Sequence, residues 1–244
     1  MKTLRILAIS IMALVLFSGI ANATPSTQIW IPSTDIQPYK ILHYGSDSYI
    51  KTTGIETGAN PGITTNIGLT VGVLPFEKIQ MEAGIDYRDT DGVHESPLLF
   101  NAKLGVPEGV LFKGAPALAV GGYDFGTEKN VSDSNIYYGL VAKTFDKIGR
   151  LSAGYYAGND KVLLDTNGDK DNTGVLLSWD RTISEVSDKL WAAIDYQGGK
   201  NAYGALSFGV AWKFAPNVGV IVGYDIYNES NYKPTATLQL DIDF

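Results

Sequence analysis

The chain has 244 residues, of which 45% are apolar and 18% charged, with 27 glycines, 14 tyrosines, no cysteine and a formal net charge of −7. This length allows one large domain, and the acidic balance argues against a nucleic-acid partner, because such binding needs a basic face. The absence of cysteine excludes disulfides and thiolate metal sites. A charged fraction below the roughly 25% of ordinary soluble domains, combined with many glycines and tyrosines, favours a β-protein with one apolar surface.

The first stretch has the features of a secretory signal peptide. Lys2 and Arg5 form a positive start, residues 6–20 are almost wholly apolar, and Ala-Asn-Ala at 21–23 matches a small-x-small cleavage pattern. The alternative is an N-terminal membrane anchor, but the apolar run is shorter than the roughly 20 residues of a spanning helix. We therefore expect residues 1–23 to be removed on export.

Residues 24–38 are too short and too interrupted by proline for a domain of their own. They contain Ile29, Trp30 and Ile31 between two prolines. We expect a periplasmic N-terminal lead-in with Trp30 at the inner interface of the membrane that the following strands span. The alternative is that this segment plugs the mouth of the following domain.

From residue 39 onward, runs of about ten residues alternate in polarity and end in turn residues, which is typical of strands that span a membrane. Twelve such runs predict strands near 39–50, 64–73, 79–88, 98–106, 117–125, 135–143, 150–157, 173–180, 190–197, 204–214, 218–227 and 235–244. An even number suits a closed antiparallel barrel, and closure is needed because lipid cannot satisfy an open sheet edge. The first run alternates poorly, so ten or fourteen strands remain possible.

The connections between the runs alternate in character. Short connections lie at 74–78, 144–149 and 215–217, whereas longer polar ones lie at 89–97, 126–134, 158–172 and 228–233. Short periplasmic turns and long outer loops are the asymmetry of outer-membrane barrels. This topology predicts that both termini of the mature chain lie in the periplasm.

The last run shows the alternation best. Its apolar face carries Ala236, Leu238, Leu240, Ile242 and Phe244, and its polar face carries Thr235, Thr237, Gln239, Asp241 and Asp243. One face therefore suits lipid and the other suits water.

A cleavable signal, alternating strands and a final Leu-x-Leu-x-Ile-x-Phe together resemble bacterial outer-membrane β-barrel proteins of the porin-like class. The resemblance implies a transmembrane barrel over residues 39–244, a Gram-negative outer-membrane location, lipid as its surroundings and no cofactor. It also implies that Phe244 is similar to the terminal aromatic read by the barrel-assembly machinery. The competing interpretation, a secreted β-sandwich, is disfavoured because its strands are usually five or six residues long.

The predicted lumen is rich in charge. On the inward faces we expect the acids Glu82, Asp86, Asp124, Asp180, Asp195, Asp225, Asp241 and Asp243 and the bases Arg88, Lys103, Lys143, Arg150 and Lys213. The excess of acids predicts a narrow channel that passes small cationic or neutral polar solutes. Channels of this class for acidic sugars have lumens lined with arginine, which this sequence does not match. The alternative is a closed structural or adhesive barrel whose charges pair across the lumen.

One acidic loop resembles the start of a calcium-binding loop. Its alternating oxygen-bearing residues are Asp165, Asn167, Asp169 and Asp171. An EF-hand is excluded because its sixth position is Lys170 rather than Gly and its twelfth is Leu176 rather than Glu. A solvated acidic turn is the default, with a loose calcium site as the alternative.

His94-Glu95-Ser96 resembles the His-x-Ser of the outer-membrane phospholipase, which is also a twelve-stranded barrel. In that enzyme an Asn orients the His at a site that faces lipid, whereas Asn101 is expected to face the lumen here. We therefore expect no enzyme, and a lipid-acting activity ranks behind both the channel and the structural barrel.

Overall fold

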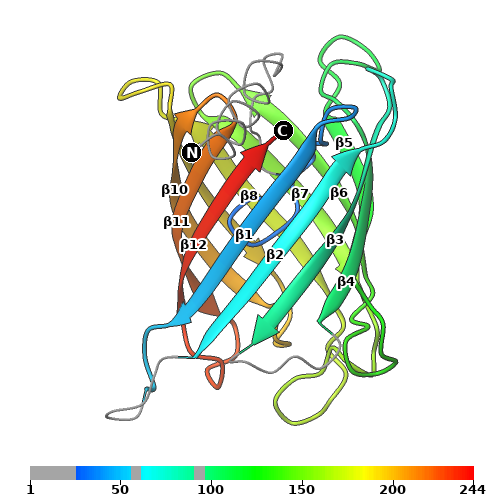
Figure 1. Ribbon diagram of the computed structural model, residues 1–244, viewed down its shortest axis with the longest axis vertical. Helices are drawn as coiled ribbons and strands as arrows, with labels where there is room; N and C mark the ends of the chain where they lie inside the picture. Colours follow the sequence, from blue (N-terminus) through cyan, green and yellow to red (C-terminus); the bar gives the residue numbers. More distant parts are fainter. Residues whose placement is uncertain (1–25, 56–61, 91–96) are drawn as a thin grey trace, which may run out of the picture.

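In a computed structural model, which describes residues 26–55, 62–90 and 97–244, the chain forms one closed antiparallel barrel (Figure 1). Its strands are β1 (Leu42–Lys51), β2 (Ile63–Gly72), β3 (Gln80–Thr90), β4 (Leu98–Val106), β5 (Ala117–Gly126), β6 (Ile136–Phe145), β7 (Gly149–Ala157), β8 (Thr173–Thr182), β9 (Leu190–Gln197), β10 (Ala205–Ala215), β11 (Val218–Tyr227) and β12 (Thr235–Asp243). Over the described ranges, no helix is long and apolar enough to cross a membrane.

The twelve predicted strands are confirmed, including the uncertain first one. Strand β1 begins at Leu42 rather than at residue 39. Lys40 has a φ of 66°, in the left-handed region, and this turn interrupts the extended chain just before the strand.

Closure depends on the pairing of β1 with β12. The register sets His43 opposite Asp243 and Lys51 opposite Thr235. Beyond the ladder, the N–H of Phe244 donates to the carbonyl of Leu42 over 2.8 Å, and the N–H of Leu42 donates back over 3.2 Å. The C-terminal residue therefore completes the seam that removes the last open edge.

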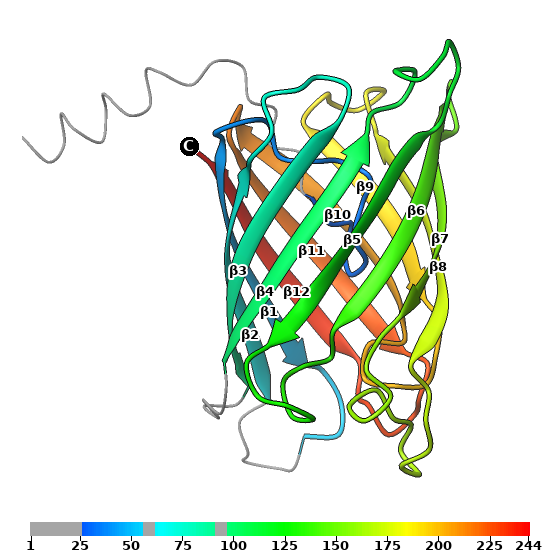
Figure 2. The same cartoon turned by 90° about the vertical axis from the view of Figure 1, so that its right-hand side faces the viewer.

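The barrel has two distinct ends, which we call the turn end and the loop end. The turn end carries the short connections 146–148 and 216–217 and the end of β12, at the top of Figure 1. The loop end carries connections such as 158–172 and 228–234, and Figure 2 shows these loops at the bottom.

Alternation along the strands gives the wall an apolar outside and a polar inside. In β12 the outward Leu238 is 50% exposed, whereas the inward Thr237 and Gln239 are 2% and 3% exposed. Val222, which pairs with Leu238 from the neighbouring strand β11, is 55% exposed. Such a belt of exposed aliphatic side chains suits lipid rather than water.

A charge placed on this belt should therefore be costly. We expect Leu238→Arg, near the middle of β12, to lower the free energy of unfolding by about 2–4 kcal/mol in lipid vesicles. Thr64→Arg is the matched control, because Thr64 lines an open part of the lumen and its substitution should cost much less. Equal losses in denaturant titrations of both variants would contradict the assigned faces.

The described part of the N-terminal segment, residues 26–38, lies inside the barrel, where Figure 2 shows it as a blue chain enclosed by the strands. Residues 26–33 form what we call the inner hairpin. Thr27 bridges Pro32, and the N–H of Gln28 donates to the carbonyl of Ile31 over 2.7 Å. The expectation that Trp30 lies at the inner interface is wrong, because lumenal side chains hold the inner hairpin inside the barrel. The periplasmic side of this segment stays a prediction.

Candidate functional site: the lumen and its inner hairpin

The inner hairpin leaves two cavities in the lumen. A cavity of about 710 Å³, the loop-end cavity, is lined by residues such as Trp30, Asp47, Thr64 and Asp86. A cavity of about 860 Å³, the turn-end cavity, is lined by residues such as Arg150, Trp191 and Lys213. Thr27 and Asp241 line both cavities, so the two spaces approach each other beside the hairpin.

Polar side chains of the wall hold the tip of the hairpin. Asp195 Oδ2 accepts the backbone N–H groups of Ile29, over 2.7 Å, and Trp30, over 3.1 Å. On the other side of the tip, Gln239 Nε2 donates to the carbonyl of Ile29 over 2.7 Å. The hairpin's own backbone groups thus find partners in the wall, as burial requires.

Small residues make room for the hairpin. A side chain on Gly209 or Gly223 would place its Cβ about 3.0 Å from atoms of Ile29. Glycine at these inward positions of β10 and β11 therefore allows Ile29, which is 1% exposed, to lie directly against the wall.

A buried ion pair anchors both ends of the segment. Lys103 Nζ lies 3.1 Å from Glu82 Oε1, and these side chains are 3% and 5% exposed. Lys103 also donates to the carbonyl of Ser26 over 2.8 Å, and Glu82 Oε2 accepts the N–H of Gln37 over 2.7 Å. One pair between β3 and β4 thereby fixes the segment where it enters and where it leaves the lumen.

A second pair lies toward the turn end. Arg150 Nε donates to Asp180 Oδ1 over 2.9 Å, and its Nη1 lies 2.7 Å from Asp35 Oδ1. Gln28 Nε2 also donates to Asp180 Oδ1 over 2.9 Å. Charge pairing in the lumen therefore involves the N-terminal segment as well as the strands.

Aromatic rings surround Trp30 at the loop end. Its ring centroid lies 5.1 Å from that of Tyr49 and 5.7 Å from that of Tyr227, both at nearly perpendicular angles. The indole N–H donates to the carbonyl of Tyr203 over 2.8 Å. These edge-to-face contacts place the tip of the hairpin deep in the barrel.

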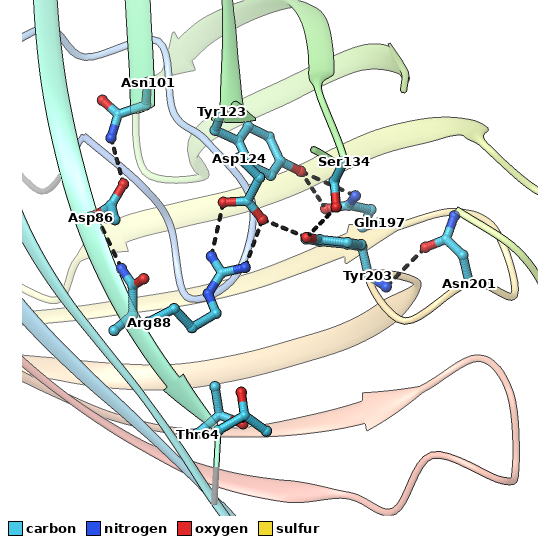
Figure 3. A network of polar contacts seen from close by, with 12 residues as sticks. Thr64, Asp86, Arg88, Asn101, Tyr123, Asp124, Ser134, Gln197, Asn201 and Tyr203 are labelled. Carbon is cyan, nitrogen blue, oxygen red and sulfur yellow. Dashed lines mark hydrogen bonds and ion pairs between the residues drawn. The ribbon is translucent and has the colours of Figure 1, made fainter. Parts of the chain in front are cut away.

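Figure 3 shows a polar network on the wall of the loop-end cavity. Arg88 forms two hydrogen bonds with Asp124, over 2.7 and 2.9 Å, and the hydroxyl of Tyr203 donates to the same carboxylate. Asp124 has a φ of 56°, which turns its side chain inward beside that of Tyr123. The Arg88 charge is thereby neutralised within the wall.

Asp86 is held differently. Its two oxygens accept amide hydrogens from Asn66, over 3.1 Å, and Asn101, over 2.6 Å (Figure 3). These amides orient the carboxylate, which forms no ion pair among the described residues. Asn101 faces the lumen as the sequence indicates.

His43 lies beside two acids of β12. Its Nε2 is 3.2 Å from Asp241 Oδ1, and its Nδ1 is 2.8 Å from Asp243 Oδ1. Asp241 borders both cavities, and His43 borders the loop-end cavity.

The structure places twelve of the thirteen predicted lumenal charges on the inner side of the barrel wall. Glu82, Asp86, Arg88, Lys103 and Asp124 line the loop-end cavity, Arg150, Asp180 and Lys213 line the turn-end cavity, and Asp241 lines both. Asp195, Asp225 and Asp243 also point inward but are no more than 1% exposed; Asp195 contacts the hairpin, Asp225 accepts from Thr235, and Asp243 lies beside His43. They hold the structure together rather than bordering open space.

The prediction that Lys143 faces the lumen is wrong, because this residue lies on the outer face of the barrel. It pairs with Leu151, which is 45% exposed, while its neighbours Ala142 and Thr144 pair with the inward Ser152 and Arg150. Its Nζ lies 2.6 Å from Glu108 Oε1 in the connection between β4 and β5. A lysine at a strand end can reach this partner outside the apolar belt.

Three inward ionisable residues of β1 were missed by the sequence reasoning, namely His43, Asp47 and Lys51. Alternate positions of this strand point inward, opposite Asp243, Gln239 and Thr235 of β12. Small and polar residues on both faces of β1 hid its register. The pairing signal was the regular β12, whose polar face fixes that of its neighbour.

The acidic loop 158–172 provides hydrogen bonds within itself. Asp165 Oδ1 accepts the N–H groups of Asn167 and Asp169, both over 2.9 Å, and these bonds lower the pKa of Asp165. Asp171 accepts the N–H of Lys200. In the described part of the chain, no three His, Asp or Glu side chains are grouped to hold a metal. His94, Glu95 and Ser96 lie outside the described residues.

No protein-family model and no curated protein sequence matches the chain. Among solved structures, it is similar to the KdgM porin, with a TM-score of 0.52 and 7% identity over 84% of this chain and 99% of that one. It is also similar to an outer membrane channel from Pseudomonas putida F1, with a TM-score of 0.50 and 10% identity over 86% and 97%. A third similar structure is a KdgM porin in complex with disordered oligogalacturonate, with a TM-score of 0.51 and 10% identity over 82% of this chain and 99% of that one. The chain thus has the fold of outer-membrane porins and channels.

Proposed function

We propose that this protein is an outer-membrane channel for passive diffusion of small cationic or neutral polar solutes. The observation that carries the proposal is the pair of lumenal cavities, which extend along the barrel from opposite ends and approach each other at Thr27 and Asp241. A solute would pass beside the inner hairpin rather than through an empty barrel. The porin fold supports this role.

The carboxylates inside the loop-end cavity support a preference for cations over anions, and the two further lysines of its lining, Lys51 and Lys233, are exposed at the loop end. Arg88 and Lys103 are neutralised by Asp124 and Glu82. Asp47 and Asp86 also line this cavity, and neither takes part in an ion pair among the described residues. Uncompensated carboxylates on a narrow wall raise the local concentration of cations.

The solved KdgM complex contains oligogalacturonate, which is a polyanion. The acidic wall of this chain is poorly suited to that kind of solute. We therefore propose a different solute class for this channel, even though the barrels are alike.

A non-conducting structural or adhesive barrel is the second candidate. It is favoured by the close packing of the hairpin, in which Ile29 and Ile31 are 1% and 0% exposed. Under this alternative the hairpin closes the lumen permanently and the acidic loop 158–172 meets an external partner.

Single-channel recording of the refolded protein in planar bilayers tests the proposal. We expect discrete conductance steps with potassium preferred over chloride, and a preference that weakens as salt screens the wall over a Debye length of about 10 Å at 0.1 M. Asp47→Asn with Asp86→Asn should shift the reversal potential in a salt gradient toward the anion side. Asp169→Asn, in the 158–172 loop, is the matched control and should change it little.

The outcomes separate the candidates. Folded barrels that never conduct would support the structural alternative, and anion selectivity would contradict the proposed solute class.

We also propose that residues 1–23 are removed on export, that both mature termini lie in the periplasm and that Phe244 serves as the assembly signal. On this orientation residues 160–171 are exposed at the cell surface and residues 145–149 are not. Because the chain has no cysteine, an impermeant maleimide on intact cells should label Asp169→Cys and leave Lys147→Cys unlabelled. If only the Lys147→Cys variant were labelled, the barrel would have the opposite orientation to the one proposed.

A further inference from the structure

Four aromatic side chains form a continuous wall of the loop-end cavity, namely Trp30, Tyr49, Tyr227 and Tyr232. Trp30 meets Tyr49 and Tyr227 edge to face, at interplanar angles of 84° and 88°. The ring centroid of Tyr232 lies 6.1 Å from that of Tyr227. Each of these residues is half-buried and borders the cavity, so this aromatic wall presents ring surface to a solute.

A carboxylate lies directly beside the aromatic wall. Asp47 is two residues before Tyr49 on β1, so both side chains lie on the inward face of the strand. At a rise of about 3.4 Å per residue, their Cα atoms are roughly 7 Å apart. This spacing leaves room for a small charged group between the carboxylate and the ring.

The side chains on either side of Asp47 do not neutralise it. Its cross-strand neighbours are the amides Gln239 on β12 and Asn66 on β2. Gln239 Nε2 donates to the carbonyl of Ile29 over 2.7 Å, and Asn66 Nδ2 donates to Asp86 over 3.1 Å. Asp47 is half-buried and lines the cavity, so its carboxylate is available to a cation that enters from the loop end.

We propose that the loop-end cavity binds a small organic ammonium ion, with the charged nitrogen between the Asp47 carboxylate and the aromatic wall. The inference rests on the proposed cation channel and names the class of its solute. Aromatic faces attract a cation within about 6 Å of the ring centroid, and the carboxylate compensates its charge. The apolar substituents of the ammonium group are removed from water against the rings.

The size and the remaining charges of the cavity agree with such a ligand. Its volume of about 710 Å³ lies in the range of about 300–1,000 Å³ that is typical of sites for small organic molecules. Arg88 and Lys103 are already paired with acids of the wall. Lys51 and Lys233 are exposed at the loop end, where water and salt screen their charge.

Other solutes satisfy only one half of this recognition. A potassium ion has the charge but no apolar surface to bury against the rings. A neutral molecule of the same shape has the apolar surface but no charge for Asp47. The strongest binding therefore requires both properties in one solute.

Isothermal titration of the full refolded protein in detergent tests the inference without any measurement of conductance. Choline is the probe, and its uncharged analogue, with a carbon atom in place of the nitrogen, is the matched ligand. We expect one saturable site for choline. The uncharged analogue and potassium should each bind about tenfold more weakly or worse.

Substitutions in the aromatic wall and at the carboxylate separate the two contributions. Tyr49→Leu should weaken choline binding about three- to thirtyfold because the ring face is lost, whereas Tyr49→Phe keeps the ring and should bind like the wild type. Asp47→Asn should weaken binding about tenfold or more, since the charge is lost and the shape is kept. Tyr155→Leu is the matched control, because Tyr155 is 55% exposed on the outer face of β7. If Tyr49→Leu does not refold, Tyr232→Leu removes another ring of the same wall and should also weaken binding.

The inference is overturned if choline shows no saturable binding, if its uncharged analogue binds equally well, or if the lumenal variants bind like the wild type. Loss of binding in Tyr155→Leu would overturn it as well. Saturable choline binding by a barrel that does not conduct would support the site and contradict the proposed channel. Cation-selective conductance without choline binding would overturn the site and support the channel.

Discussion

Deleting residues 24–36 behind the intact signal segment should raise single-channel conductance several-fold. The inner hairpin lies across the lumen. The two cavities approach each other beside it, near Thr27 and Asp241. Twelve strands enclose a lumen between the filled eight-stranded barrels and the open porins, so the hairpin occupies much of the free cross-section. Planar-bilayer recording of wild type and deletion variant under the same salt measures the difference.

A milder variant distinguishes the effect of the hairpin on the width of the lumen from general damage to the barrel. Gln239→Met keeps the size of a side chain that donates to the carbonyl of Ile29, but removes that hydrogen bond. We expect normal main steps with more frequent brief openings, because the hairpin tip is held less firmly. If the deletion variant folds well and its conductance is unchanged, the hairpin does not narrow the conducting path, and the prediction is wrong.

The barrel could be predicted from the sequence because alternation is a strong local signal. The polar and apolar faces of 235–244 and the connection lengths predicted closure and the inward direction of most charges, and they favoured twelve strands while the weak first run left ten or fourteen open. One slip of a residue would place charges such as Asp241 in lipid, so the register is strongly specified.

Lys143 was misplaced because the rule of polar inside and apolar outside fails locally. On β6 the inward residues Ile136, Tyr138, Leu140 and Ala142 are themselves apolar and buried. Three of them pack in one cluster with Ile31 of the inner hairpin. The inner wall is apolar here because it meets the hairpin rather than water, so the only charged residue of the strand lies on the opposite face.

The position of the hairpin could not be read from residues 24–38 alone. Three of its partners, Asp195, Gln239 and Lys103, lie between 77 and 210 positions away along the chain. Local pattern predicts strands, whereas these contacts exist only after the barrel has closed. The isolated Ile-Trp-Ile was the available signal, because such a short apolar run needs a buried surface to pack on.

Lys103→Met should lower the free energy of unfolding by about 3–5 kcal/mol, because it leaves the Glu82 carboxylate buried without its cation. The Glu82–Lys103 pair is almost fully buried and also binds the backbone at Ser26 and Gln37. The loss should therefore loosen the inner hairpin as well as the wall. Denaturant titration of the protein refolded in lipid vesicles measures the change.

A double substitution and a substitution in an exposed ion pair serve as controls for Lys103→Met. Glu82→Gln combined with Lys103→Met should recover most of the loss, since the stranded charge is gone and the amide oxygen can still accept the N–H of Gln37. Lys170→Met removes the cation of a pair with Asp160 whose side chains are 62% and 43% exposed, and should cost less than about 1 kcal/mol. If Lys103→Met were as mild as Lys170→Met, water would have to reach the Glu82 carboxylate, and the anchoring of the hairpin at both ends would be refuted.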